Sequence, residues 1–228
     1  MTATRAAILL LLLASCSGAP APEPSASETP DPARPLPLPL PEVVARVNGQ
    51  EIRIRQILPL AKSALDRVSV ADREKRKPEI VRQALDSYVT RELLLQEALA
   101  RGIAADTREV ERSFDQMRGA YAGEAEWAEF LAGAGMDPQS FKAELRVQAT
   151  VAALVARELQ DYPVPEAEAR AAFESNPAAF GPPEAAAPPS FDAVRGDVEM
   201  AVRRGKAGEI QAALVARLRA RARIEIYL

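Results

Sequence analysis

The sequence predicts a mainly α-helical domain that is closed by a small sheet pairing the two ends of its folded region. Long segments carry apolar residues at helical spacing between capping residues, glycines and prolines. Alternating, β-prone segments occur near the start of this region, at Val43–Ile54, and at its end, at Arg223–Leu228. Because a lone strand is not stable without a partner, we expect these two segments to pair.

The segment nearest the start predicts a hairpin followed by helices. Asn48-Gly49 is a strong signal for a hairpin turn between two strands. The clearest helix spans Glu79–Ala100, because Pro78 stands at its start and Gly102 just past its end. The other helices are expected over about Arg55–Val68, from an Asp106 cap, over Glu124–Ala132, from Asp137 to about Leu159, over Glu166–Ser175, and from a Ser190 cap through Leu218.

The apolar positions of the first two helices predict which faces are buried. Arg73–Lys77, between these helices, is expected to form a solvated loop. The last helix contains Gly196, Gly205 and Gly208, each of which costs about 1 kcal/mol relative to alanine, so we expect its middle to be weak. The residues predicted to face the core are Ile57, Leu58, Ala61, Leu65 and Val68, then Ile80, Ala84, Leu85, Tyr88, Val89, Leu95 and Leu99.

The first sixteen residues have the pattern of an export signal. Arg5 gives a positive start, and Ala6–Ala14 is an apolar run of nine residues, within the ~7–15 typical of a signal peptide and short of the ~20 that span a bilayer. Leu13-Ala14-Ser15-Cys16 resembles the lipobox of bacterial lipoproteins, and Cys16 is the only cysteine in the chain. The resemblance implies cleavage after residue 15 and a lipid on Cys16. An ordinary signal peptide followed by an incidental cysteine is the alternative.

Residues 16–41 are expected to tether the folded region to a membrane. Nine prolines fall among residues 17–41, a composition that favours an extended, partly polyproline II chain with a reach of roughly 70 Å. A ligand role for this segment, in the groove of another protein, is an alternative to simple reach. Residues 42–228 are expected to form a single domain, with residues 181–189 as a second Pro-rich loop.

Composition excludes several classes of function. Lysine and arginine number 29 against 32 aspartate and glutamate residues, and no basic patch occurs, so nucleic acid is not an expected partner. The chain has no histidine and a single cysteine, which excludes zinc sites, iron–sulfur sites and Cys/His catalysis. Clustered carboxylates such as Glu124, Glu126 and Glu129 lack a nucleophile nearby in the sequence and fit a solvated helix face. We therefore predict no catalytic residue, no metal and no cofactor.

Aromatic and methionine residues concentrate between Phe114 and Phe141, in a segment punctuated by glycines. Such side chains could offer adaptable apolar surface to polypeptides of varied sequence. Phe114, Phe130 and Phe141 fit a hydrophobic core better than a binding surface. The candidates for a polypeptide-binding groove, which could equally fill a core, are Met117, Tyr121, Trp127 and Met136.

Several segments resemble, in the right order, the periplasmic chaperones of the SurA type. Val43–Arg55 is similar to the opening strand, Asn-Gly turn and second strand of that family. Ala84–Ala98, followed by Gly102, resembles its second long helix. Pro163–Phe180 is similar to the region that leads into a parvulin prolyl isomerase module, and Ser190–Ile226 to the returning helix and final strand. The resemblance implies a helical peptide-binding domain like those of SurA and trigger factor.

The chain differs from the isomerase-bearing members of the family in having no room for a parvulin module. The parvulin module would lie between Phe180 and Ser190, where this chain has only nine residues, and the parvulin site uses histidines, which the chain lacks. We therefore expect a lipid-anchored, chaperone-like protein that faces the periplasm and binds unfolded or exported polypeptides without ATP and without isomerase activity. Ser17 favours the outer membrane, because it is not the aspartate that retains lipoproteins of enterobacterial type at the inner membrane.

Two alternatives remain at this point. The chain could be an accessory lipoprotein that binds one fixed partner in a cell-envelope complex, or, less favoured, a prolyl isomerase with a different site. The sequence leaves the oligomeric state open.

Overall fold

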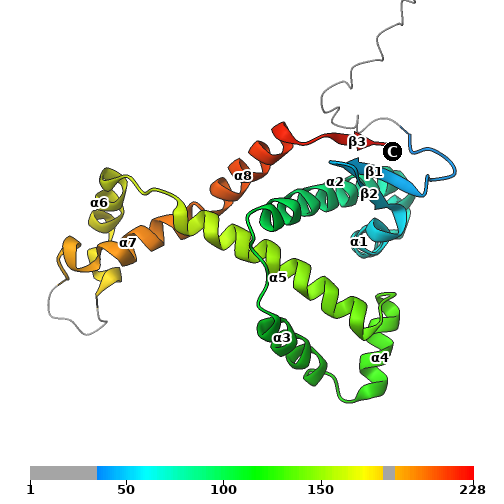
Figure 1. The fold of residues 1–228 in the computed structure, drawn as a ribbon, viewed down its shortest axis with the longest axis horizontal. Coiled ribbons are helices and arrows are strands. Elements are labelled where there is room, and N and C mark those ends of the chain that lie inside the picture. Colours follow the sequence, from blue (N-terminus) through cyan, green and yellow to red (C-terminus); the bar gives the residue numbers. More distant parts are fainter. Residues whose placement is uncertain (1–34, 182–187) are drawn as a thin grey trace, which may run out of the picture.

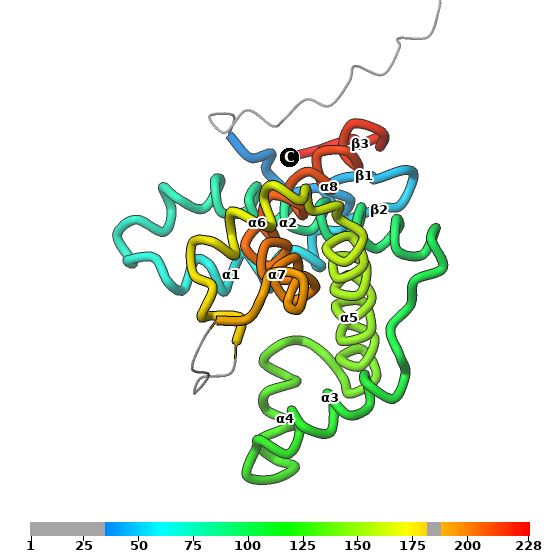
Figure 2. Tube along the Cα trace, turned by 90° about the vertical axis from the view of Figure 1, so that its left-hand side faces the viewer, coloured from blue at the N-terminus to red at the C-terminus, as the bar shows by residue number. Residues whose placement is uncertain are grey.

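Helices of unequal length extend from a small sheet in an elongated molecule (Figure 1). The computed structural model describes residues 35–181 and 188–228. The long helix α5 carries α3 and α4 at one end, remote from the sheet, and α6 and α7 at its other end (Figures 1 and 2). The elements are β1 (Val43–Val47), β2 (Gln50–Arg53), α1 (Ile54–Asp66), the short 3₁₀ helix η1 (Val70–Asp72), α2 (Arg73–Ala100), α3 (Thr107–Gly119), α4 (Glu124–Gly133), α5 (Pro138–Asp161), α6 (Glu166–Ser175), the 3₁₀ helix η2 (Pro177–Phe180), α7 (Phe191–Gly205), α8 (Ala207–Arg221) and β3 (Ile224–Ile226).

The sheet joins the two ends of the folded region, as the sequence predicts. Its strand order is β2-β1-β3, and both neighbours run antiparallel to β1. Asn48 and Gly49 connect β1 to β2 with φ angles of 51° and 88°, the left-handed backbone that a type I′ turn requires. The Asn48 side chain also links this turn to the start of β3, because its Oδ1 accepts a hydrogen bond from the amide of Arg223, just before β3. The expected mainly α-helical fold with a sheet made from its two ends is therefore confirmed.

The main hydrophobic core lies between the sheet, α1, α2, the second half of α5, and α8. Leu85 and Val89 of α2, Leu154 of α5 and Leu214 of α8 are fully buried in it. The predicted apolar face of α2 is thus confirmed in most of its positions. The prediction that Leu58 of α1 and Leu99 of α2 face the core is wrong, because these side chains are 45% and 60% exposed. Both lie at the border of the apolar face, where helical spacing alone does not decide burial.

The end of the Pro-rich segment also contributes to this core. Leu36 and Leu40 are partly buried and pack against it, whereas Leu38 between them is 92% exposed. Packed structure therefore begins before residue 42, at which we expected the domain to start. Residues 1–34, with the predicted signal peptide, Cys16 and most of the tether, lie outside the described residues.

Helix α2 begins six residues earlier than the sequence indicates. The expected loop Arg73–Lys77 forms its first turns, and Pro78 lies inside the helix. Ion pairs along the helix surface support these turns, between Lys77 and Glu74 and between Arg76 and Glu79. Pro78 has no amide hydrogen, so the carbonyl of Glu74, four residues earlier, lacks its usual helical donor.

The predicted last helix is divided in two at Lys206. The carbonyl of Val202 accepts a hydrogen bond from the Lys206 amide, which ends α7, and the Lys206 carbonyl accepts one from the Ile210 amide, which begins α8. The Lys206 ammonium pairs with Glu168 of α6 at 3.0 Å. The break lets α7 pack against α6 and α8 pack against α2 and α5. Ser190 occupies the N-cap of α7 as predicted, but its side chain makes no capping hydrogen bond.

Candidate functional site

An aromatic cluster holds α3, α4 and the first half of α5 together, apart from the main core. We define it by the residues that meet there. Trp127 of α4 lies at its centre, with ring centroids 5.6 Å from Phe114, 5.5 Å from Phe141, 5.4 Å from Phe130 and 5.3 Å from Tyr121. The edge-to-face and stacked arrangements among these rings are favourable beyond the area they bury. The cluster comprises the buried Phe114, Trp127, Leu131 and Phe141 and the partly buried Tyr121, Phe130, Met136 and Leu145.

Local sequence signals position the three helices of this cluster. The carboxylate of Asp106 caps α3 by accepting a hydrogen bond from the Arg108 amide at 2.7 Å. Asp137 caps α5 in the same way through the Ser140 amide, also at 2.7 Å. Gly135, with φ of 66°, provides the left-handed turn that brings α5 back against α4. These capping predictions are confirmed.

A hollow of about 600 Å³ opens on the surface of the aromatic cluster. Its wall is mostly apolar, and charged side chains stand at its rim. The lining residues come from all three helices and from the turn before α5. They are Phe114, Arg118, Glu124, Trp127, Ala128, Leu131, Ala132, Met136, Asp137, Pro138 and Lys142. A hollow of this size can take one or a few apolar side chains of a ligand.

The four candidate residues have different places in this arrangement. Trp127 and Met136 both line the hollow, but Trp127 is 4% exposed and is mainly a core residue of the cluster. Tyr121 is half-buried against Trp127 and does not line the hollow. Met117 is 37% exposed on α3 and also lies outside the lining. The expectation that Phe114 and Phe141 fill a core is confirmed.

Sequence reasoning did not identify the small residues of the hollow. Ala128 and Ala132 are exposed on α4, one helical turn apart, and their short side chains leave the space that the hollow occupies. Pro138 closes one side at the start of α5. Alanines next to a tryptophan on an amphipathic helix are a weak signal, because most such alanines only reflect helix propensity.

Two of the charged groups at the rim have pKa values that keep them ionised near neutral pH. Hydrogen bonds from the Ser140 amide and hydroxyl hold the pKa of Asp137 below its usual range. A hydrogen bond to Glu124 raises the pKa of Arg118. Lys142 bonds Glu111 and lies 4.4 Å from the centre of the Phe114 ring. Both Asp137 and Arg118 therefore keep their charge near neutral pH, so the rim suits electrostatic orientation of a ligand better than proton transfer.

The structure adds two observations on membrane and metal chemistry. Within residues 35–181 and 188–228, no helix is both long enough and apolar enough to span a bilayer. In the same part of the chain, no three or more Asp, Glu or Cys side chains are grouped as metal ligands.

A third apolar cluster joins α6, η2 and α7, next to the point in the chain where other members of the family would carry a parvulin module. It is built on Ala169, Phe191 and Val198. Gly181 and Pro189 lie against each other there, since a Cβ on Gly181 would come within 2.9 Å of the proline ring. Residues 182–187 lie outside the described residues, and Gly181 and Pro189 on either side of them are adjacent.

Helices that pack on a small sheet made from the two ends of the folded region are the arrangement expected of a SurA-like domain. The comparison with protein families agrees. A family model described as the SurA-like N-terminal domain matches residues 35–155, more than half of the chain, and the chain belongs to this family. The match includes β1 to α4 and most of α5, and therefore the whole hollow. Among curated proteins, nothing matches the chain.

Proposed function

We propose that this protein is a lipid-anchored, chaperone-like protein that faces the periplasm and binds unfolded or exported polypeptides without ATP. Family membership supports a chaperone-type envelope protein. The observation that carries the binding proposal is the apolar hollow between α3, α4 and α5, which lies within the matched domain.

The hollow has the properties that a binder of varied sequences needs. Leu131 and Met136 provide apolar contact, and the methionine adapts its shape at low cost. Arg118, Glu124 and Lys142 place both signs of charge at the rim, so that clients of either sign can approach. A polypeptide would insert apolar side chains into the hollow while its backbone stays in water. Such binding is weak and reversible, as a holding chaperone requires.

The position of the hollow agrees with an N-terminal lipid anchor. The described chain starts at residue 35 near the sheet, whereas α3 and α4 lie at the opposite end of the molecule (Figure 1). Lipid on Cys16, together with the Pro-rich tether, would concentrate a weak binder at the membrane surface and leave the hollow accessible to clients. Ser17 supports the outer membrane as the site of anchoring.

The sequence supports binding without prolyl isomerase activity. The chain has no histidine, and the nine residues 181–189 are too few for a parvulin module. We infer that the chain keeps the peptide-binding part of its family and works by holding its clients.

The proposal is tested by diluting a urea-unfolded outer-membrane protein into buffer with and without the purified protein. We expect light scattering to rise more slowly in its presence, without added ATP, and several unrelated unfolded peptides to bind. No effect on scattering and no binding of varied peptides would overturn the proposal. Capture of one tight partner, without binding of varied peptides, would instead support an accessory lipoprotein of an envelope complex.

A further inference from the structure

The two edges of the sheet are not equivalent. In the β1–β2 pair, a register shift between Val43 and Ala45 of β1 distorts the pairing. At the end of β2 the Arg53 amide bonds the Gln56 side chain, and the chain turns directly into α1. A bulge in the pairing and a chain that turns away at the strand end limit further pairing at an edge. The β1–β3 pairing has no such shift, and β3 contains no proline. The edge formed by β3 is therefore the less obstructed one, and we call it the open edge.

Backbone groups at the open edge point away from β1. The amide of Tyr227 donates to the carbonyl of Val44 at 3.0 Å, and the carbonyl of Arg223 accepts from the Asn48 amide at 2.8 Å. Because backbone direction alternates along a strand, the N–H and C=O groups of Ile224 and Ile226 face outward. In the part of the chain that the structure describes, no hydrogen bond reaches these outward groups.

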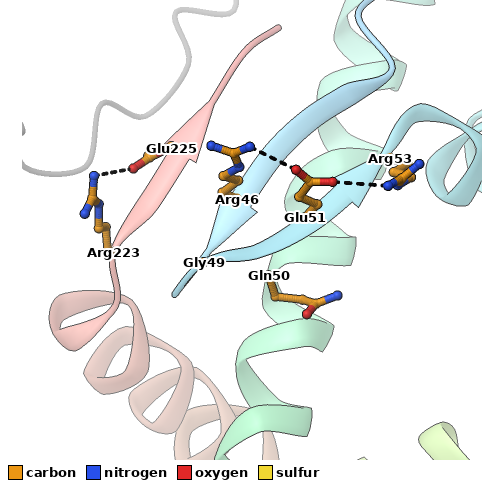
Figure 3. Close-up of a pocket in the computed structure, with 7 residues that line it drawn as sticks. All are labelled: Arg46, Gly49, Gln50, Glu51, Arg53, Arg223 and Glu225. Carbon is orange, nitrogen blue, oxygen red and sulfur yellow. Dashed lines mark hydrogen bonds and ion pairs between the residues drawn. The ribbon is translucent and has the colours of Figure 1, made fainter.

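The two faces of β3 differ in chemistry. Ile224 and Ile226 are only half-buried and pack against the main core. Glu225 points to the opposite face, where Figure 3 shows it beside Arg223 and near Arg46 of β1. On this face the Tyr227 hydroxyl also donates to Glu225 at 2.6 Å. The edge thus combines free backbone groups, an incompletely buried apolar face and a charged face.

We propose that the open edge of β3 binds an extended polypeptide segment as an additional antiparallel strand of the sheet. This inference rests on the proposed binding of unfolded polypeptides and adds a second contact, remote from the hollow between α3, α4 and α5 (Figure 1). An added strand would satisfy the outward groups of Ile224 and Ile226 and complete the burial of their side chains. Antiparallel addition continues the pairing of the whole sheet and is the more stable kind.

The proposal defines the class of segment that fits. Residues opposite Ile224 and Ile226 share their face, so alternate positions of the bound segment should be apolar. The intervening positions lie beside Arg223, Glu225 and Tyr227 and should be polar or charged. A shift by one residue would turn every apolar side chain to the charged face, so the alternation also fixes the register. The ligand is an unfolded chain that has the pattern of a two-faced β-strand.

Backbone methylation of a peptide tests this geometry directly. The probe is a synthetic peptide of alternating valine and threonine with lysine at both ends. In the antiparallel arrangement the valine amides face β3, because Ile224 and its opposite residue exchange their hydrogen bonds. We expect N-methylation of the valines to weaken binding about tenfold or more, and N-methylation of the threonines to change it by less than about twofold. Equal binding of the two methylated peptides, or loss with methylated threonines alone, would overturn the proposal.

A second test changes the backbone groups of β3 instead of those of the peptide. Ile224→Pro removes one outward N–H, at an edge position where proline is tolerated, and Ile224→Ala removes similar apolar contact but keeps that N–H. We expect Ile224→Pro to bind the unmethylated peptide more weakly than Ile224→Ala does, with both variants checked for folding by circular dichroism. Should Ile224→Pro fail to fold, the two methylated peptides on the unaltered protein decide the question.

The outcomes also separate this inference from the proposed function. If Ile224→Pro binds the peptide as Ile224→Ala does, while the protein still slows aggregation, the edge proposal fails and the proposed function stands. If the unaltered protein binds no peptide and does not slow aggregation, both fail. A dimer that Ile224→Pro abolishes and that excess peptide does not disrupt would assign the edge to a second copy of the chain, and would overturn the proposal.

Discussion

Burial divides the candidate residues into two kinds. Trp127 is enclosed by four aromatic rings, whereas Met117 stands on the outer side of α3. The sequence placed both in one aromatic and methionine-rich segment, because composition shows where such residues gather. It does not show which of them faces the interior, since that depends on how α4 folds back against α5.

The first prediction concerns the stability of the aromatic cluster. Trp127→Ala removes the central side chain and should lower the free energy of unfolding by about 3–5 kcal/mol. Met117→Ala, at a 37% exposed position, should change it by about 0.5 kcal/mol or less and is the control. Urea unfolding followed by far-ultraviolet circular dichroism measures both. A loss below about 1 kcal/mol for Trp127→Ala would show that this residue is not a core residue.

At the scale of elements, one carboxylate connects three helical segments. Glu158 of α5 pairs with Arg101, at the end of α2, at 2.5 Å and with Arg217 of α8 at 2.9 Å, and its side chain is 17% exposed. Burial acts to raise the pKa of Glu158, but the hydrogen bonds and charges of the two arginines outweigh it and hold the pKa below its usual range. The ionised form is therefore the one that stabilises the fold.

The second prediction follows from the sign of this pKa change. A carboxyl with a lowered pKa in the folded state contributes its stabilisation above its unfolded pKa of about 4.3 and loses it as the pH falls through the folded value. Glu158→Gln should therefore cost about 1–3 kcal/mol at pH 7, and the difference from the unaltered protein should shrink as the pH falls below about 4. Urea unfolding at several pH values measures this difference.

A control variant makes that result specific. Glu174 is an exposed carboxylate of α6, and Glu174→Gln should leave stability unchanged within about 0.5 kcal/mol. If the cost of Glu158→Gln were the same at pH 7 and pH 3.5, the ionised carboxylate would not be the stabilising group.

Element boundaries could be predicted where a single residue sets them. Asp106 and Asp137 cap their helices as expected, because capping depends on neighbours in the sequence. The early start of α2 was missed although the ion pairs that support it are local. The break at Lys206 lies between Gly205 and Gly208, where the sequence predicted a weak helix but not two separate helices. Only the packing of α7 on α6 and of α8 on α2 and α5 makes two helices more stable than one.

At the scale of the molecule, the pairing of the two ends of the folded region was predictable and the overall arrangement was not. Few segments had β-strand patterns, so their pairing was the economical solution. Helical periodicity, by contrast, shows that a helix has an apolar face but not which helix will cover it. The sequence therefore predicted a single domain, but it did not predict three apolar clusters along an elongated molecule or the hollow between α3, α4 and α5.

The central claim, that clients bind in the hollow, is tested most directly by two substitutions on α4. Ala128 lines the hollow, and Ala125 is exposed on the same helix outside it. Ala128→Lys and Ala125→Lys should each change stability by about 0.5 kcal/mol or less, because both positions are exposed. We expect Ala128→Lys to lose most of the ability to slow aggregation of an unfolded outer-membrane protein, and Ala125→Lys to keep it. Equal activity of the two variants would contradict binding in the hollow.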